Sequence, residues 1–163
     1  MKKRSNILKM MSLVAACMLA INLSAQTETN LSSYRLGGGI LIDLGDGGTL
    51  VGPHVKYFFD QHNAGEAAVL FGRGVTTVQG IYTYNLGFPE VDGLRWNIGA
   101  GPSVAFGSGS TLFSIMGAIG LEYVVPTAPF ALGVDWRPRF YIYDSETYFE
   151  AARFSLGLRY TFN

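Results

Sequence analysis

From residue 34 to the end of the chain, large apolar residues alternate with small or polar ones. Successive side chains of a β-strand point to opposite faces, so a period of two predicts strands. The alternating runs cover residues 34–44, 49–59, 66–71, 75–85, 94–106, 113–123, 130–140 and 152–162. Residues typical of turns separate them, at 45–48, 60–63, 72–74, 86–93, 107–110, 126–129 and 144–146. The phase of the 75–85 run is ambiguous.

These runs predict an all-β fold, namely an eight-stranded antiparallel up-and-down barrel over residues 33–163. Propeller blades and internal repeats also alternate, but the runs share no motif beyond the alternation. Most runs have about ten residues, the length of a tilted strand that crosses a bilayer. A single meander therefore accounts for the whole pattern.

The two alternating sets differ in size, and this difference predicts which set faces outward. One set holds the bulky residues, such as Trp96, Ile119 and Leu156, and the other holds glycine, alanine, serine and nearly all strand charges. Eight strands enclose an interior only just wide enough for side chains, so the bulky set would overfill it. The bulky set therefore faces lipid, and the barrel is predicted to be transmembrane.

Aromatic residues lie where a membrane barrel needs interfacial girdles. They end several predicted strands, at Tyr57, Phe58, Phe59, Tyr82, Tyr84, Tyr123, Tyr160 and Phe162. Rings with polar edges favour the membrane interface. An ordinary β-core also contains aromatics, and this reading remains open.

The first residues have the layout of a secretory signal peptide. Lys2, Lys3, Arg4 and Lys9 precede an apolar run over 10–23, and Ser24 and Ala25 follow it. We predict a signal peptide over 1–25 and a short segment over 26–32. Cys17, the only cysteine, follows a lipobox-like sequence and would be a lipidated N-terminus in an alternative reading.

Removal of this leader leaves eight basic and twelve acidic residues, a net charge of −4. No basic stretch remains, so we expect no nucleic-acid partner.

Four segments of the chain carry a resemblance to a known family. They are 52–59 (GPHVKYFF), 120–123 (GLEY), 128–138 (APFALGVDWRP) and 158–162 (LRYTF). They resemble small outer-membrane β-barrel proteins of Bacteroidetes-type bacteria, distant from the OmpA and OmpX barrels. The resemblance implies a Gram-negative outer membrane, with its lipids and lipopolysaccharide as surroundings. It also implies delivery to the barrel assembly machinery through the final aromatic strand, although Asn163 follows Phe162 here.

Charged residues on the inward phase are the candidate site. They are Lys56, Glu66, Arg95, Glu122, Asp135, Arg137, Arg139, Arg153 and Arg159. Buried charges persist only when paired, so we expect Glu66, Glu122 and Asp135 to bridge to Lys56, Arg137 and Arg159. This interior polar network would be structural, filling the lumen and excluding an open pore.

The leading interpretation is a monomeric structural or interaction barrel, with no catalytic residues, no cofactor and no metal. One alternative is a lipid A-modifying enzyme, for which His54 and His62 are the available histidines outside the leader. A second is a secreted soluble barrel of the lipocalin kind, which would need an apolar inner face. The acids Asp46, Asp144, Glu146 and Glu150 are expected in loops at one rim, solvated or in contact with cations or sugars.

Overall fold

The computed structural model describes residues 34–162 except 47, 108 and 144–145. Its strands are β1 (Leu36–Gly45), β2 (Gly48–Phe58), β3 (Asn63–Gly72), β4 (Val75–Gly87), β5 (Leu94–Gly107), β6 (Ser110–Val124), β7 (Phe130–Trp136), β8 (Arg139–Tyr143), β9 (Glu146–Glu150) and β10 (Arg153–Phe162). The predicted signal peptide with Cys17, the segment 26–32 and Asp144 lie outside the described residues. No helix among the described residues is long and apolar enough to cross a bilayer.

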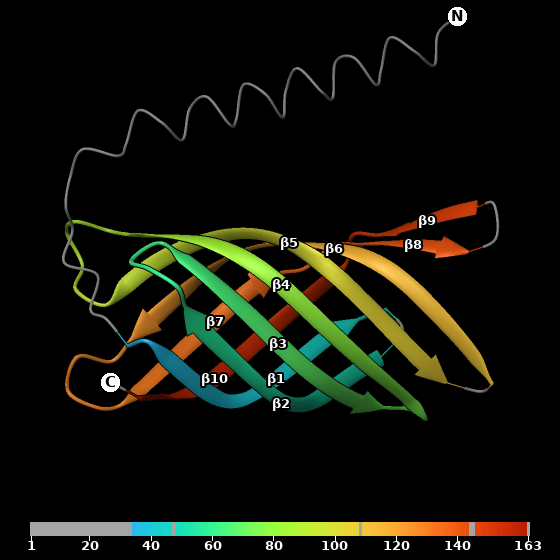
Figure 1. Ribbon diagram of the computed structural model, residues 1–163, viewed down its shortest axis with the longest axis horizontal. Coiled ribbons are helices and arrows are strands. Elements are labelled where there is room, and N and C mark those ends of the chain that lie inside the picture. The colour runs from blue at the N-terminus through green and yellow to red at the C-terminus, as the bar shows by residue number, and fades with distance from the viewer. Residues whose placement is uncertain (1–33, 47, 108, 144–145, 163) are drawn as a thin grey trace, which may run out of the picture.

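The strands form one closed antiparallel sheet (Figure 1). From β1 to β6 each strand pairs with the next along the chain, and β1 pairs with β10 from Leu36↔Phe162 to Gly45↔Arg153. Both β7 and β8 pair with β6, while β10 pairs with β7 and β9 with β8. Thus β7 with β8, and β9 with β10, are two interrupted strands, and the predicted eight-stranded antiparallel barrel is confirmed.

A proline explains why the predicted strand 130–140 is divided. Pro138 has no N–H group to donate to a neighbouring strand, and β7 ends two residues before it. Arg137 N still donates to Arg153 O (2.8 Å), and Gly117 N donates to Pro138 O (3.0 Å). The Trp136 indole N–H donates to Ala151 O (2.6 Å), so a backbone carbonyl at the opposing break, residues 151–152, also has a hydrogen-bond partner. The wall therefore continues across both breaks.

The bulky set faces outward and the charged set faces the lumen. Ile119 is 49% exposed, Leu156 44% and Trp136 37%, whereas Glu122 is 1% exposed. The phase of β4 is now settled, because Thr77, Gln79, Ile81, Thr83 and Asn85 are its buried residues. Every strand that spans the barrel wall carries exposed apolar side chains.

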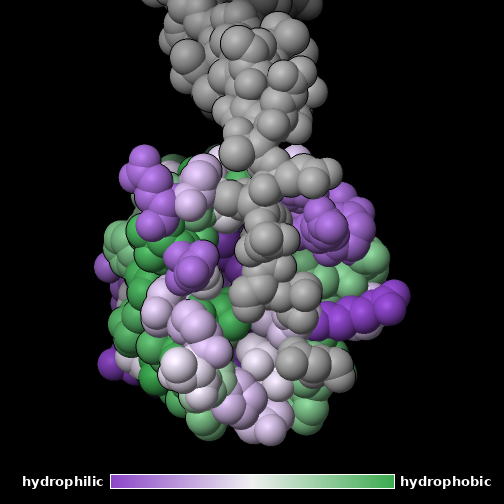
Figure 2. Space-filling view, turned by 90° about the vertical axis from the view of Figure 1, so that its left-hand side faces the viewer, coloured by the Kyte–Doolittle hydropathy of each residue, from purple (hydrophilic) through white to green (hydrophobic). Residues whose placement is uncertain are grey.

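The two ends of the barrel differ. Residues 34 and 162 lie at one end, together with the turns at 59–62, 88–93 and 125–129 (Figure 1). Figure 2 shows this end, with hydrophilic residues around the rim and hydrophobic ones on the flanks. The opposite end has tight hairpin turns, such as Arg73–Gly74, where both residues have positive φ (49° and 73°), as type I′ turns require. There the β8–β9 hairpin extends past β10 and stands apart from the β1–β2 turn.

Two predictions about individual residues are wrong. Phe58 was expected in an aromatic girdle, but it faces the lumen and is 5% exposed, because its inward phase continues from His54 and Lys56. Glu150 was expected in a solvated loop, but it ends β9 and is buried, because residues 146–150 form a strand instead of a turn. Asp46 does lie exposed in a turn.

Candidate functional site

The lumen holds nearly all the charged side chains of the barrel wall. Its buried ionisable residues are Asp43, His54, Lys56, Glu66, Arg95, Glu122, Asp135, Arg137, Arg139, Glu150, Arg153 and Arg159. Each lies on the inward phase of a strand or at its end, because the two-residue period brings alternate positions to one face. Hydrogen bonds divide them into two groups.

Glu122 is the most connected carboxylate. It accepts hydrogen bonds from Tyr34 Oη (3.0 Å to Oε1), Lys56 Nζ (3.2 Å) and Arg159 Nη2, and it forms an ion pair with Arg95 Nε (3.2 Å). These partners come from the segment before β1 and from β2, β5 and β10. One carboxylate on β6 therefore connects distant parts of the barrel wall.

Glu66 on β3 is a second centre. Its carboxylate pairs with Lys56 Nζ (3.2 Å) and Arg137 Nη2 (3.0 Å), and lies 3.2 Å from His54 Nε2. The other ring nitrogen of His54, Nδ1, lies 3.2 Å from Arg159 Nη1. Lys56 and Arg159 thus link Glu66 to Glu122.

Asp135 completes this group. It accepts from Arg137 Nη2 (2.9 Å), Asn97 Nδ2 (3.1 Å) and Ser155 Oγ (3.3 Å). The structure therefore brings together all six residues of the predicted network. We refer to Lys56, Glu66, Glu122, Asp135, Arg137 and Arg159, with Tyr34, His54 and Arg95, as the central network.

A distal cluster lies toward the end opposite the termini. Asp43 accepts from Arg153 Nη1 (2.7 Å) and from Arg139 Nη2, which also donates to Gln79 Oε1 (2.9 Å). Glu150 accepts from Arg153 Nε (3.1 Å) and from the Tyr141 hydroxyl (2.9 Å). The expected solvated acid at 150 is therefore an interior counter-ion.

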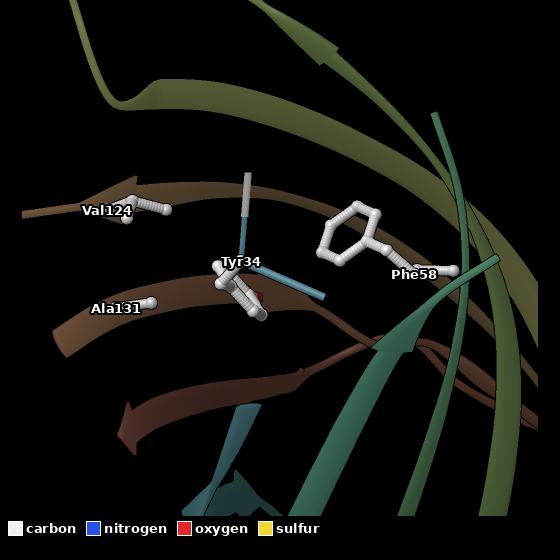
Figure 3. Packing of buried hydrophobic residues seen from close by; sticks show 5 residues of the cluster. Tyr34, Phe58, Val124 and Ala131 are labelled. Carbon is white, nitrogen blue, oxygen red and sulfur yellow. The ribbon is translucent and has the colours of Figure 1, made fainter. Parts of the chain in front are cut away.

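Apolar side chains pack together inside the barrel at the end where residues 34 and 162 lie. Tyr34, Phe58, Ala64, Val124 and Ala131 form a buried cluster, the terminal plug (Figure 3). The rings of Tyr34 and Phe58 meet edge to face, with centroids 5.2 Å apart. The Arg95 guanidinium lies 4.9 Å from the centre of the Phe58 ring, a favourable cation–π contact. Tyr34 thus belongs to the plug through its ring and to the central network through its hydroxyl.

The opposite end of the lumen is open. A cavity of about 310 Å³ lies there, lined by residues of β2 to β6, β8 and β10 and of the β3–β4 turn. Arg139, Tyr141 and Arg153 of the distal cluster line it, and we call this cavity the mouth. The lumen therefore holds a packed apolar cluster toward one end and a cavity toward the other.

His54 lies between charged partners in the lumen. Both ring nitrogens of His54 face charged partners, and neither has a hydroxyl nucleophile among its hydrogen-bond partners. Within the described residues, no group of three His, Cys, Asp or Glu side chains is arranged to hold a metal ion.

Several polar contributors were not identified from the sequence. Asp43 and Asn97 lie on inward phases, so the alternation itself marks them as lumen residues. Tyr34 carries no such signal, because it precedes β1 and turns inward through the backbone of 34–35. The Tyr34 side chain points inward because its contacts, such as Glu122 and Phe58, come together only in the closed barrel.

Two solved structures are similar to this chain. The N-terminal β-barrel domain of OprF from Pseudomonas aeruginosa matches with a TM-score of 0.57 and 17% identity, covering 78% of this chain and 96% of that one. A structure from the de novo design of transmembrane β-barrels matches with a TM-score of 0.56 and 12% identity, covering 78% and 94%. Neither a scan against models of protein families nor a comparison with curated proteins gives a match. At these identities the likeness shows the fold, which is the closed barrel that designed transmembrane proteins also adopt.

Proposed function

We propose that this chain is a structural barrel of a Gram-negative outer membrane, inserted through its apolar outer wall and closed by its filled lumen. The observation that carries the proposal is the direction in which the side chains point. Large apolar side chains cover the outer wall, and charged side chains lie in the lumen. Ile40, Ile119 and Leu132 are each about half exposed, whereas Lys56, Glu122 and Arg137 are about 1% exposed. A soluble barrel keeps its large apolar groups inside, so this arrangement suits a lipid environment.

The lumen contacts support a barrel without a through-channel. The central network joins residues of β2, β3, β5, β6, β7 and β10 across the interior, and the terminal plug lies beyond it. Eight strands leave little space besides these side chains. The charged interior also argues against the lipocalin alternative, since an apolar ligand would face ion pairs.

The proposal includes partners and surroundings. Outer-membrane lipids and lipopolysaccharide would contact the outer wall, and the barrel assembly machinery would receive the last strand, which ends at the exposed Phe162. The barrel closes on itself through β1 and β10, so it needs no second copy to satisfy a strand edge there. We therefore propose a monomer.

Fractionation of cells that express the chain tests the proposal. We expect the protein in the outer-membrane fraction, and its electrophoretic migration to change when the sample is boiled, because the closed barrel resists unfolding in detergent. Reconstituted into a planar bilayer, it should produce no current steps above those of the empty bilayer. Recovery in the soluble periplasmic fraction would refute membrane insertion, and regular current steps would refute the closed lumen.

A further inference from the structure

The mouth is a part of the lumen that neither the central network nor the terminal plug fills. Its volume of about 310 Å³ is at the lower end of the range for small-molecule pockets. The cavity lies among the hairpin turns opposite the termini and can be entered without opening the barrel wall. It can therefore take a small organic molecule.

The charges at the mouth favour an anion. Arg73, Arg139 and Arg153 line the cavity, and its lining includes no carboxylate among the side chains that the structure describes. Asp43 and Glu150 bind Arg139 and Arg153, but Arg73 has no ion-pair partner among the described residues. A Cβ on Gly48 would lie only 2.8 Å from Arg73 Nε, so the Arg73 side chain reaches from the β3–β4 turn to the start of β2. The opening therefore presents the Arg73 guanidinium, which pairs with no carboxylate that the structure describes.

Arg139 supplies a second observation that points to a ligand. The residue is 2% exposed and lines the cavity, and its Nε has no hydrogen-bond partner among the residues that the structure describes. A buried guanidinium donor without an acceptor is costly. An anionic oxygen in the mouth would satisfy it.

The wall above these arginines is aromatic and apolar. Tyr141 lines the cavity, and Tyr148 lies opposite it on β9, with the two rings nearly parallel and their centroids 6.3 Å apart. Tyr148 is 65% exposed although it shares the inward face of the hairpin with Tyr141. Leu50 and Leu112 line other sides of the same cavity. Such surroundings suit a flat ring.

We infer that the mouth binds a small organic monoanion with an aromatic ring, its carboxylate near Arg73 and Arg139 and its ring beside Tyr141. This site goes beyond the proposed structural function. The two are tested separately, because a barrel that inserts and migrates normally can still lack the site.

A titration of the purified barrel in lipid nanodiscs tests the inference. The probe is 4-hydroxybenzoate, and the readout is the amide chemical shifts of Arg73, Tyr141 and Tyr148 by NMR. We expect saturable shifts there, and binding about tenfold weaker for 4-hydroxybenzamide, which has the same shape without the charge. Acetate, which has the charge without the ring, should also bind more weakly.

Two variants distinguish the site from nonspecific attraction. Arg73→Asn removes the charge while tolerating the positive φ at this position, and should weaken 4-hydroxybenzoate binding about tenfold. Tyr148→Ser, at an exposed side chain, should also weaken it. The matched control is Arg35→Gln at the opposite end, where an exposed arginine is removed and binding should not change. Equal binding of acid and amide, an equal effect of Arg35→Gln, or an absence of saturable shifts at the mouth would each overturn the inference.

Discussion

Glu122 and Asp135 illustrate how single carboxylates differ inside one lumen. Glu122 pairs with three cations, Lys56, Arg95 and Arg159, and also accepts a hydrogen bond from the Tyr34 hydroxyl. Asp135 forms an ion pair with one cation, Arg137, which also pairs with Glu66. Removing one partner of a buried ion pair is costly because the other charge stays desolvated. The cost should therefore depend on how many cations lose their carboxylate.

We expect Glu122→Gln to lower the free energy of unfolding in detergent by about 3–5 kcal/mol. Asp135→Asn should cost less, because Arg137 keeps its contact with Glu66. Equilibrium urea unfolding followed by tryptophan fluorescence measures both. Glu90→Gln, at an exposed residue of the β4–β5 turn, is the control and should have little effect. The same loss for Asp135→Asn as for Glu122→Gln would contradict this ranking.

The turn at 59–62 predicts a pH effect outside the barrel wall. The Asn63 side-chain amide donates to Asp60 Oδ2 (2.7 Å), and the backbone N–H groups of His62 and Asn63 donate to Oδ1 (2.8 Å each). These donors hold the pKa of Asp60 below its usual 3.8. A folded pKa below the unfolded one means that the carboxylate stabilises the turn above pH 3.8, and that this contribution is lost as the pH falls through the folded pKa.

A carboxyl NMR titration of Asp60 should therefore give a midpoint below 3.8. Asn63→Ala removes the side-chain donor, which is the largest cause of the shift, and should raise the midpoint. A midpoint at or above 3.8 in the unmodified protein, or no response to Asn63→Ala, would show that these hydrogen bonds do not hold the carboxylate.

Among the strands, the alternation was informative wherever the inward residue was small or charged. The strand 153–162 is the clearest case, because Phe154, Leu156 and Leu158 face out while Ser155, Gly157 and Arg159 face in. At Phe58 the alternation was right, and the assignment of strand-end aromatics to a girdle was wrong, because Phe58 keeps the inward phase of His54 and Lys56. The alternation could not reveal residues 146–150 as a strand, because the aromatic Tyr148 there faces the lumen side.

The sequence allowed us to predict which residues belong to the candidate site, but not which of them contact one another. Inward phase identified the six network residues, since phase depends only on local sequence. Their pairing depends on distances across the lumen, as between Tyr34 and Glu122, which are 88 positions apart. Such contacts follow from barrel closure and register. Neither is encoded in the period of a single strand.

Close contacts between neighbouring strands lead to a third prediction. A Cβ at Gly101 on β5 would lie 2.0 Å from Gly80 O on β4, whereas a Cβ at Gly80 would meet nothing nearer than 3.9 Å. Gly101→Ala should therefore destabilise the barrel by about 1–3 kcal/mol through overpacking. Gly80→Ala, almost opposite it, is the matched control and should be neutral or slightly stabilising, because alanine loses less backbone entropy on folding. Equal urea midpoints for the two variants would contradict the close approach.

The complete barrel has two surfaces of opposite character, an apolar outer wall and a charged inner surface. The outer wall exposes large apolar side chains, such as those of Val134, Leu156 and Ile119, which are unfavourable in contact with water. The inner surface is stable only where ion pairs are complete, because water is scarce in the lumen. Membrane insertion would remove the outer wall from water, and the central network supplies ion pairs on the inner surface. The outer wall can therefore be tested by a change that leaves every lumen contact intact.

Ile119→Arg makes that change near the middle of β6, on the outer face. In phospholipid vesicles we expect it to lower the free energy of unfolding by about 2–4 kcal/mol, the cost of an arginine near the bilayer midplane. Val91→Arg, at an exposed residue of the β4–β5 turn, should cost about 0–1 kcal/mol, because the turn lies at the rim. On a water-facing wall, both arginines would be tolerated alike. Equal unfolding free energies for the two variants in vesicles would therefore mean that the apolar wall does not face hydrocarbon.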